Sequence, residues 1–79
     1  MKTIPLLIQC LENHCEFTLN VESVTSSSGS VYFTFSGERY EFKCDYLSVC
    51  FYPDDTMHFV SIIDFTTTYL DLHREIFGN

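Results

Sequence analysis

The chain has 79 residues, of which eleven are Asp or Glu and only four are Lys or Arg, and its formal net charge is −7. Disordered acidic tails are poor in aromatic residues, whereas eight Phe, five Tyr and a hydrophobic content of 46% allow this chain to fold as one domain, residues 1–79. The charge argues against the classes of protein that bind DNA, RNA or anionic membranes through Lys and Arg.

The first apolar segment, residues 4–11, fits two kinds of structure. Its length and apolar continuity fit a buried strand, but four residues are spaced as on one face of a helix: Leu7, Cys10, Leu11 and His14. We favour a short N-terminal helix with Thr3 as its cap and Pro5 in its first turn. The segment also resembles the start of a signal peptide, but Gln9 and Glu12 interrupt it early, so we expect a mature cytoplasmic protein without a transmembrane segment.

Residues 17–21 alternate between apolar and polar side chains, which predicts a strand with one buried face. The serine-rich segment 26–30 predicts a turn or loop. Residues 31–35 and 39–44 then predict a β-hairpin around a type II′ turn at Gly37-Glu38, because Gly suits the first central position of that turn. This register places like residues together in three pairs: Phe35 with Tyr40, Phe33 with Phe42, and Val31 with Cys44.

A second hairpin is predicted from residues 47–52 and 57–63, joined through the turn residues Pro53-Asp54-Asp55-Thr56. We expect Tyr52 to lie opposite Met57. One face then carries Leu47, Val49, Phe51, His58, Val60 and Ile62, and the other carries Tyr46, Ser48, Cys50, Tyr52, Met57, Phe59 and Ser61. Between the two hairpins the buried positions change from even to odd, which predicts a tight turn or a bulge at Asp45-Tyr46.

Apolar residues recur every three to four positions near the C-terminus, which predicts a helix. Its apolar stripe contains Phe65, Tyr69, Leu72 and Ile76, broadened by His73. Asp64 is one candidate N-cap, Thr68 with Asp71 offers a later start, and Gly78 suits the end of the helix. The predicted fold class is therefore α+β: an antiparallel β-meander of four to five strands, with a C-terminal helix and a short N-terminal helix packed on one face.

The cysteines and histidines give little support to an enzyme or a metal site. The cysteines are Cys10, Cys15, Cys44 and Cys50, and in a cytoplasmic protein we expect them to be thiols. Cys10 and His14 do not have the spacing of a structural zinc site, so we expect no metal and no other cofactor. Catalysis by a thiol would need an activating imidazole or positive charge beside it, and no such environment is evident.

The carboxylates are explained either by a solvated acidic surface or by a surface that docks on a basic partner. The second interpretation is the more specific functional hypothesis, because exposed aromatic residues beside the acids would supply anchoring contacts to the partner. The residues that we expect to bind the partner are Asp45, Tyr46, Tyr52, Asp54, Asp55 and Phe59.

In size, charge and lack of catalytic motifs, the chain resembles small acidic inhibitors encoded by phages, including anti-CRISPR proteins and DNA mimics. The resemblance implies a non-enzymatic inhibitor that docks on the basic surface of a nucleic-acid-binding protein. Two alternatives remain open. One is a structural protein that forms a homodimer through the second aromatic face of residues 47–63, and the other is a small thiol or metal enzyme.

Overall fold

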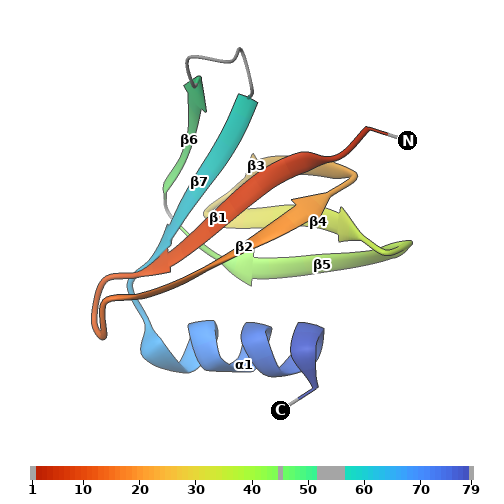
Figure 1. The fold of residues 1–79 in the computed structure, drawn as a ribbon. Coiled ribbons are helices and arrows are strands. Elements are labelled where there is room, and N and C mark those ends of the chain that lie inside the picture. The colour runs from red at the N-terminus through yellow and green to blue at the C-terminus, as the bar shows by residue number, and fades with distance from the viewer. Residues whose placement is uncertain (1, 45, 52–56, 79) are drawn as a thin grey trace.

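The structure is a computed structural model that describes residues 2–44, 46–51 and 57–78. The described residues form seven strands and a C-terminal helix (Figure 1): β1 (Ile4–Cys10), β2 (Cys15–Val21), β3 (Ser23–Ser27), β4 (Ser30–Phe35), β5 (Glu38–Lys43), β6 (Tyr46–Phe51), β7 (Met57–Ile63) and α1 (Thr66–Phe77). The α+β class is confirmed. The single meander of four to five strands is wrong, because the strands belong to two sheets.

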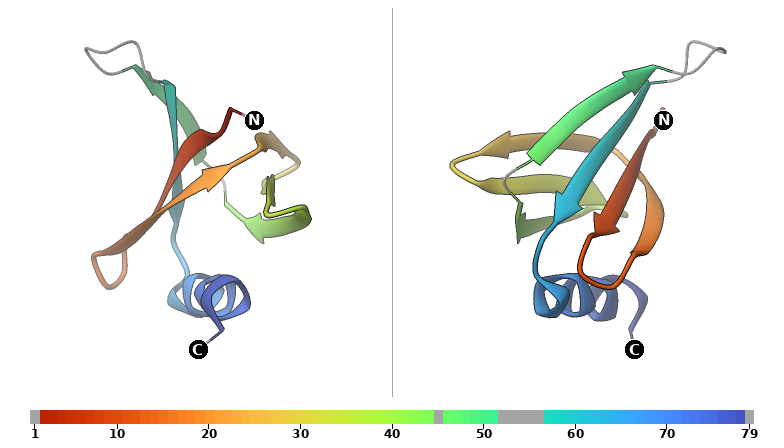
Figure 2. Two further views of the ribbon diagram at one scale, coloured as in Figure 1. Left: turned by 45° about the vertical axis from the view of Figure 1, so that its right-hand side comes forward. Right: turned by 90° about the vertical axis from the view of Figure 1, so that its left-hand side faces the viewer.

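The larger sheet, sheet A, has the strand order β2-β1-β7-β6, and the smaller one, sheet B, has the order β3-β4-β5. Neighbouring strands are antiparallel except β1 and β7, which run parallel at the centre of sheet A. Figure 2 shows the two sheets facing each other, with α1 across one end. The chain changes sheet between β5 and β6, which accounts for the shift of buried positions that the sequence shows there.

The N-terminal segment is strand β1, so the predicted N-terminal helix is wrong. β1 lies between β2 and β7, and its side chains Leu6, Ile8 and Cys10 are buried. The alternate residues Leu7 and Gln9 are half-buried. Pro5 and Leu7 on the other face are also apolar, so the sequence of β1 lacks the alternation expected of a strand with one buried face.

Strands β4 and β5 form the first predicted hairpin, but their register differs by two residues from the prediction. The turn lies at Ser36-Gly37, and the φ angles of 54° and 82° are both positive, as in a type I′ turn. The pairs on the core face are Phe33 with Tyr40 and Val31 with Phe42. Because side chains alternate along a strand, a shift of two residues changes the pairs but preserves the faces. The predicted core face is therefore confirmed, and the predicted pairs are wrong.

Strands β6 and β7 form the second predicted hairpin, with a register that differs by one residue. Phe51 faces Met57, and Val49 faces Phe59. A shift of one residue moves every side chain of one strand to the other face relative to its partner. The predicted grouping of Phe59 with Ser48 and Cys50 on one face is therefore wrong.

The core lies between the two sheets and α1. Its buried residues are Leu6, Ile8, Cys10, Leu19, Val21, Val24, Val31, Phe33, Phe42, Cys44, Ile63, Tyr69 and Leu72. Phe33 is 1% exposed, and its ring stacks on Tyr40 with a centroid distance of 5.2 Å and meets Phe42 edge-on at 5.9 Å. Aromatic pairs of this kind supply much of the packing in a core as small as this one.

Helix α1 confirms the predicted C-terminal helix. Tyr69 and Leu72 are buried and Ile76 packs against the core, but Phe65 is 62% exposed, so its place in the apolar stripe is wrong. Gly78 has a φ of 79°, and its N–H donates to the carbonyl oxygen of Arg74 at 2.7 Å. This left-handed C-cap confirms the predicted end of the helix.

Candidate functional site

The structure describes only part of the predicted partner-binding surface. The residues that lie outside the described ranges are Asp45, Tyr52, Asp54 and Asp55. Tyr46 begins β6 and pairs with Ile62, while Phe59 is half-buried in β7 and packs against the core. Phe59 is therefore not the exposed anchor that the sequence suggested.

A different set of apolar side chains is exposed on the β6–β7 hairpin. Val49 is 45% exposed, Phe51 76% and Met57 38%, and we call these three residues the hairpin patch. They lie on the same side of sheet A as Phe59, which pairs with the buried Leu6 of β1. The hairpin extends beyond the rest of the fold (Figure 1), so the patch continues the core side of the sheet into solvent. The sequence does not predict this exposed surface, because apolar residues at positions 47, 49 and 51 alternate in the way that is typical of a buried strand face.

Strand β5 and helix α1 border a groove of about 410 Å³, which we call the acidic groove. Its lining residues are Glu41, Phe42, Lys43, Thr68, Asp71, Leu72 and Glu75. Phe42 and Leu72 are buried and form an apolar floor, whereas Glu41, Asp71 and Glu75 are exposed. The groove thus combines apolar surface with three carboxylates and one ammonium group.

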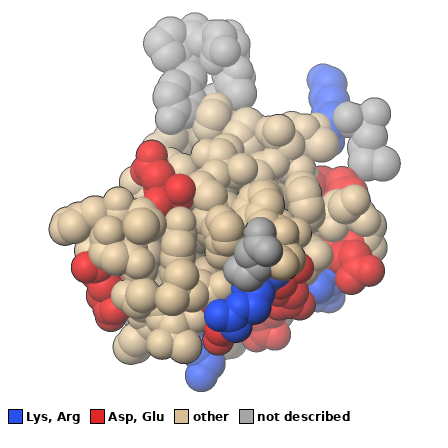
Figure 3. Space-filling model, turned by 60° about the horizontal axis from the view of Figure 1, so that its bottom comes forward, with Lys and Arg blue, Asp and Glu red and all other residues tan. Residues whose placement is uncertain are grey.

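The charges around α1 are exposed and only weakly paired. Asp71 Oδ1 lies 3.6 Å from a guanidinium nitrogen of Arg74, and both side chains are 65% exposed. An ion pair so open to water contributes little to stability, so it leaves Asp71 available to a stronger partner. In Figure 3, which brings the α1 side forward, acidic side chains occur at several places rather than in one continuous block.

Glu12 in the turn between β1 and β2 caps α1 from outside the helix. The N-cap residue Phe65 makes no side-chain cap, and both the backbone N–H and the hydroxyl of Thr66 donate to Glu12 Oε2, at 3.0 and 2.5 Å. These two hydrogen bonds hold the pKa of Glu12 below its ordinary value. The predicted caps Asp64 and Thr68 are wrong. No local sequence pattern points to Glu12 as a cap, because it is 54 residues away from Thr66.

Replacement Glu12→Gln is expected to destabilise the fold at neutral pH and to reduce the dependence of its stability on pH in the acid range. Because folding lowers the pKa of Glu12, the ionised carboxylate stabilises the fold above its ordinary pKa of 4.5, and this contribution is lost as the pH falls through the lower folded-state value. Urea unfolding from neutral pH down to about pH 3 measures both effects. Glu38→Gln, in the β4–β5 hairpin, is the control, and identical behaviour of the two variants would contradict the cap.

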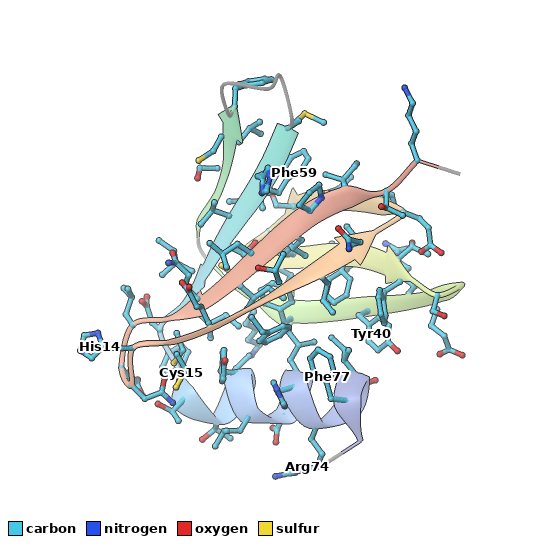
Figure 4. All side chains as sticks on the ribbon, in the orientation of Figure 1. His14, Cys15, Tyr40, Phe59, Arg74 and Phe77 are labelled. Carbon is cyan, nitrogen blue, oxygen red and sulfur yellow. The ribbon has the colours of Figure 1, made fainter. Side chains whose placement is uncertain are left out.

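The β1–β2 turn also brings two cysteines and a histidine to one small hollow. Cys10 is buried and Cys15 is exposed, and the Cys15 thiol donates to the carbonyl oxygen of Asn13 at 3.6 Å. Figure 4 shows His14 pointing outward from the turn, away from Cys15. The turn therefore does not hold the His14 imidazole against the Cys15 thiol.

Within the part of the chain that the structure describes, no group of three or more His, Cys, Asp or Glu side chains is arranged to hold a metal ion. The described residues include no helix that is long and apolar enough to cross a membrane. Comparison of the chain with protein-family models, with curated proteins and with solved structures finds no match.

Proposed function

We propose that the chain is a non-enzymatic interaction protein that docks its acidic surface on a basic, nucleic-acid-binding protein and thereby inhibits it. The observation that supports this proposal is the acidic groove, where Glu41, Asp71 and Glu75 border an apolar floor of Phe42 and Leu72. A Lys or Arg side chain suits such a groove, because its aliphatic stem packs on apolar surface while its cationic end binds carboxylates.

The net charge of −7 favours a basic protein as the partner and disfavours nucleic acid. A surface that binds phosphate backbones carries the Lys and Arg side chains that the acidic groove would accept. The acidic chain and the nucleic acid would then compete for the same cations. Since exposed charges are screened over about 8 Å at physiological ionic strength, we expect the association to weaken as salt is added.

The acids near the β6–β7 hairpin form the second part of the proposed surface. Asp45 follows the groove residue Lys43 by two positions in the chain, and Asp54 and Asp55 lie between β6 and β7. With Tyr46 and Tyr52, these residues keep the role that the sequence suggested for them. Phe59 is not retained as a contact residue, because it packs against the core.

Capture of a partner from a lysate of the native host tests the groove. We expect the tagged chain to retain a basic protein, and the double variant Glu41→Gln/Glu75→Gln to bind that protein at least about tenfold more weakly, which corresponds to about 1.4 kcal/mol. Glu16→Gln/Glu38→Gln removes the same charge from exposed positions outside the groove and is the matched control. Equal loss in both variants would indicate a bulk charge effect and contradict a groove-specific contact.

Two further measurements complete the test. Asp54→Lys/Asp55→Lys should also weaken capture, and unchanged capture would mean that these two acids do not contact the partner.

The captured protein should lose its affinity for a fluorescent nucleic acid when the acidic chain is added. If it retains that affinity, the chain binds without inhibiting, and the proposed competition with nucleic acid is wrong.

A further inference from the structure

Two outer strands of the described sheets, β3 and β6, carry no charged residue; β3 consists mainly of Ser and Thr, whereas β6 is largely apolar. Among the described strands, β6 pairs with β7 alone, and its sequence from Tyr46 to Phe51 contains no charged residue. The opposite edge of sheet A, β2, carries Glu16, and the edge strand β5 of sheet B carries four charged residues. Proteins commonly prevent unwanted strand pairing by placing charges, especially Lys, on edge strands. β6 lacks this protection.

The hairpin patch adjoins this unprotected edge. Val49 and Phe51 of β6 and Met57 of β7 expose apolar surface on one side of sheet A. The views in Figure 2 show the outer end of the β6–β7 hairpin extending beyond sheet B, whereas Leu47 and Phe59 nearer its base pack against the core. A partner strand added to β6 would therefore pair with its open backbone groups and would also cover apolar side chains that the chain itself leaves in water.

We propose that β6 pairs antiparallel with β6 of a second copy of this chain, so that two copies of the four-stranded sheet A become one continuous sheet. The sequence suggests a register with Val49 on the two-fold axis. Val49 then lies opposite Val49 of the second copy, and Leu47 lies opposite Phe51. Residues that are directly opposite share a face, so this register doubles the apolar stripe of β6 and covers Phe51.

The distribution of charge favours a second copy as the occupant of this edge. Two chains that each carry a charge of −7 repel each other over most of their surfaces, but the described hairpin residues 46–51 and 57–63 contain no Asp, Glu, Lys or Arg. This inference rests on β6 and is independent of the acidic groove.

Sedimentation equilibrium of the whole chain at micromolar concentration tests the pairing. We expect a species of twice the chain mass of 9.2 kDa, and a monomer that persists to millimolar concentration would overturn the proposal. Val49→Lys should raise the dissociation constant of the dimer at least about tenfold, because like charges directly opposite each other across strands are destabilising. Thr18→Lys adds the same charge to the exposed face of β2, at the other edge of sheet A, and should leave the dimer intact.

Cross-linking tests the register in a background that carries Cys15→Ser and Cys50→Ser. Residues that are directly opposite in antiparallel strands have Cα atoms about 4.5–5.5 Å apart, within the range that a disulfide spans. With oxidised glutathione as oxidant, Val49→Cys should therefore give a disulfide-linked dimer. Ser48→Cys, whose neighbour across the interface is position 50, is the matched control. Equal cross-linking of both variants would indicate random collision and would contradict the paired strand.

Discussion

Replacement Phe33→Ala is expected to remove about 3–5 kcal/mol from the free energy of unfolding. Phe33 is 1% exposed, stacks on Tyr40 and meets Phe42 edge-on, so its loss would leave a cavity between sheet B and the rest of the core. A domain of this size has a total stability of roughly 4–12 kcal/mol. The variant should therefore unfold at a much lower urea concentration than the wild type, as followed by far-ultraviolet circular dichroism.

Phe51→Ala is the matched control, because it removes the same side chain from a position that is 76% exposed. In dilute solution, where the chain is monomeric, its effect should stay within about 0.5 kcal/mol. If both variants lost the same stability, Phe33 would not occupy the packed position between the sheets. Measurement at low protein concentration keeps any dimerisation through β6 from adding to the result.

Native alkylation is expected to divide the four cysteines into two pairs. Cys15 and Cys50 are exposed and should react with iodoacetamide in the folded protein, whereas Cys10 and Cys44 are buried. The Cys44 thiol also donates to the carbonyl oxygen of Ile62 at 2.6 Å. The buried thiols should react only when the chain opens, so their modification should be slower by a factor that approaches the folding equilibrium constant, about 10³ or more.

Mass spectrometry of the intact chain follows this reaction directly. Two adducts should form rapidly on the folded protein and four in urea, and peptide mapping should assign the rapid pair to Cys15 and Cys50. The urea sample is the control, because it shows that all four thiols can react. Modification of Cys10 at the rate of Cys15 would mean that the end of β1 is open to solvent, contrary to the burial of Cys10 beside Thr66.

Local sequence patterns predicted the elements whose contacts are close in the chain. The alternation over residues 17–21 became β2, the turn near Gly37 joined β4 to β5, and the stripe through Tyr69 and Leu72 became the buried side of α1. β1 was not predicted, because it is defined by its pairing with β7 near the other end of the chain. No pattern within residues 4–11 contains that information.

The register of the second hairpin could not be determined from its sequence. Both faces of residues 47–52 and 57–63 are largely apolar, so the hydrophobic pattern accepts two registers that differ by one residue. That single step places Phe59 on the same side of the sheet as Val49 and Phe51, and Phe51 is exposed because the hairpin extends beyond the rest of the fold. The acidic groove could not be predicted from the sequence either. It depends on α1 packing beside β5, and only the fold brings Glu41 and Glu75 together.

The parallel pairing of β1 with β7 also affects the order in which the chain can fold. Sheet B consists of three consecutive strands, which can pair while the chain is still being made, but β1 must wait for residues 57–63 before its second edge is covered. Contacts between such distant segments form slowly, because a long loop must close first. Until residues 57–63 have been made, β1 thus remains an apolar strand with an open edge, and this edge exposes the nascent chain to aggregation.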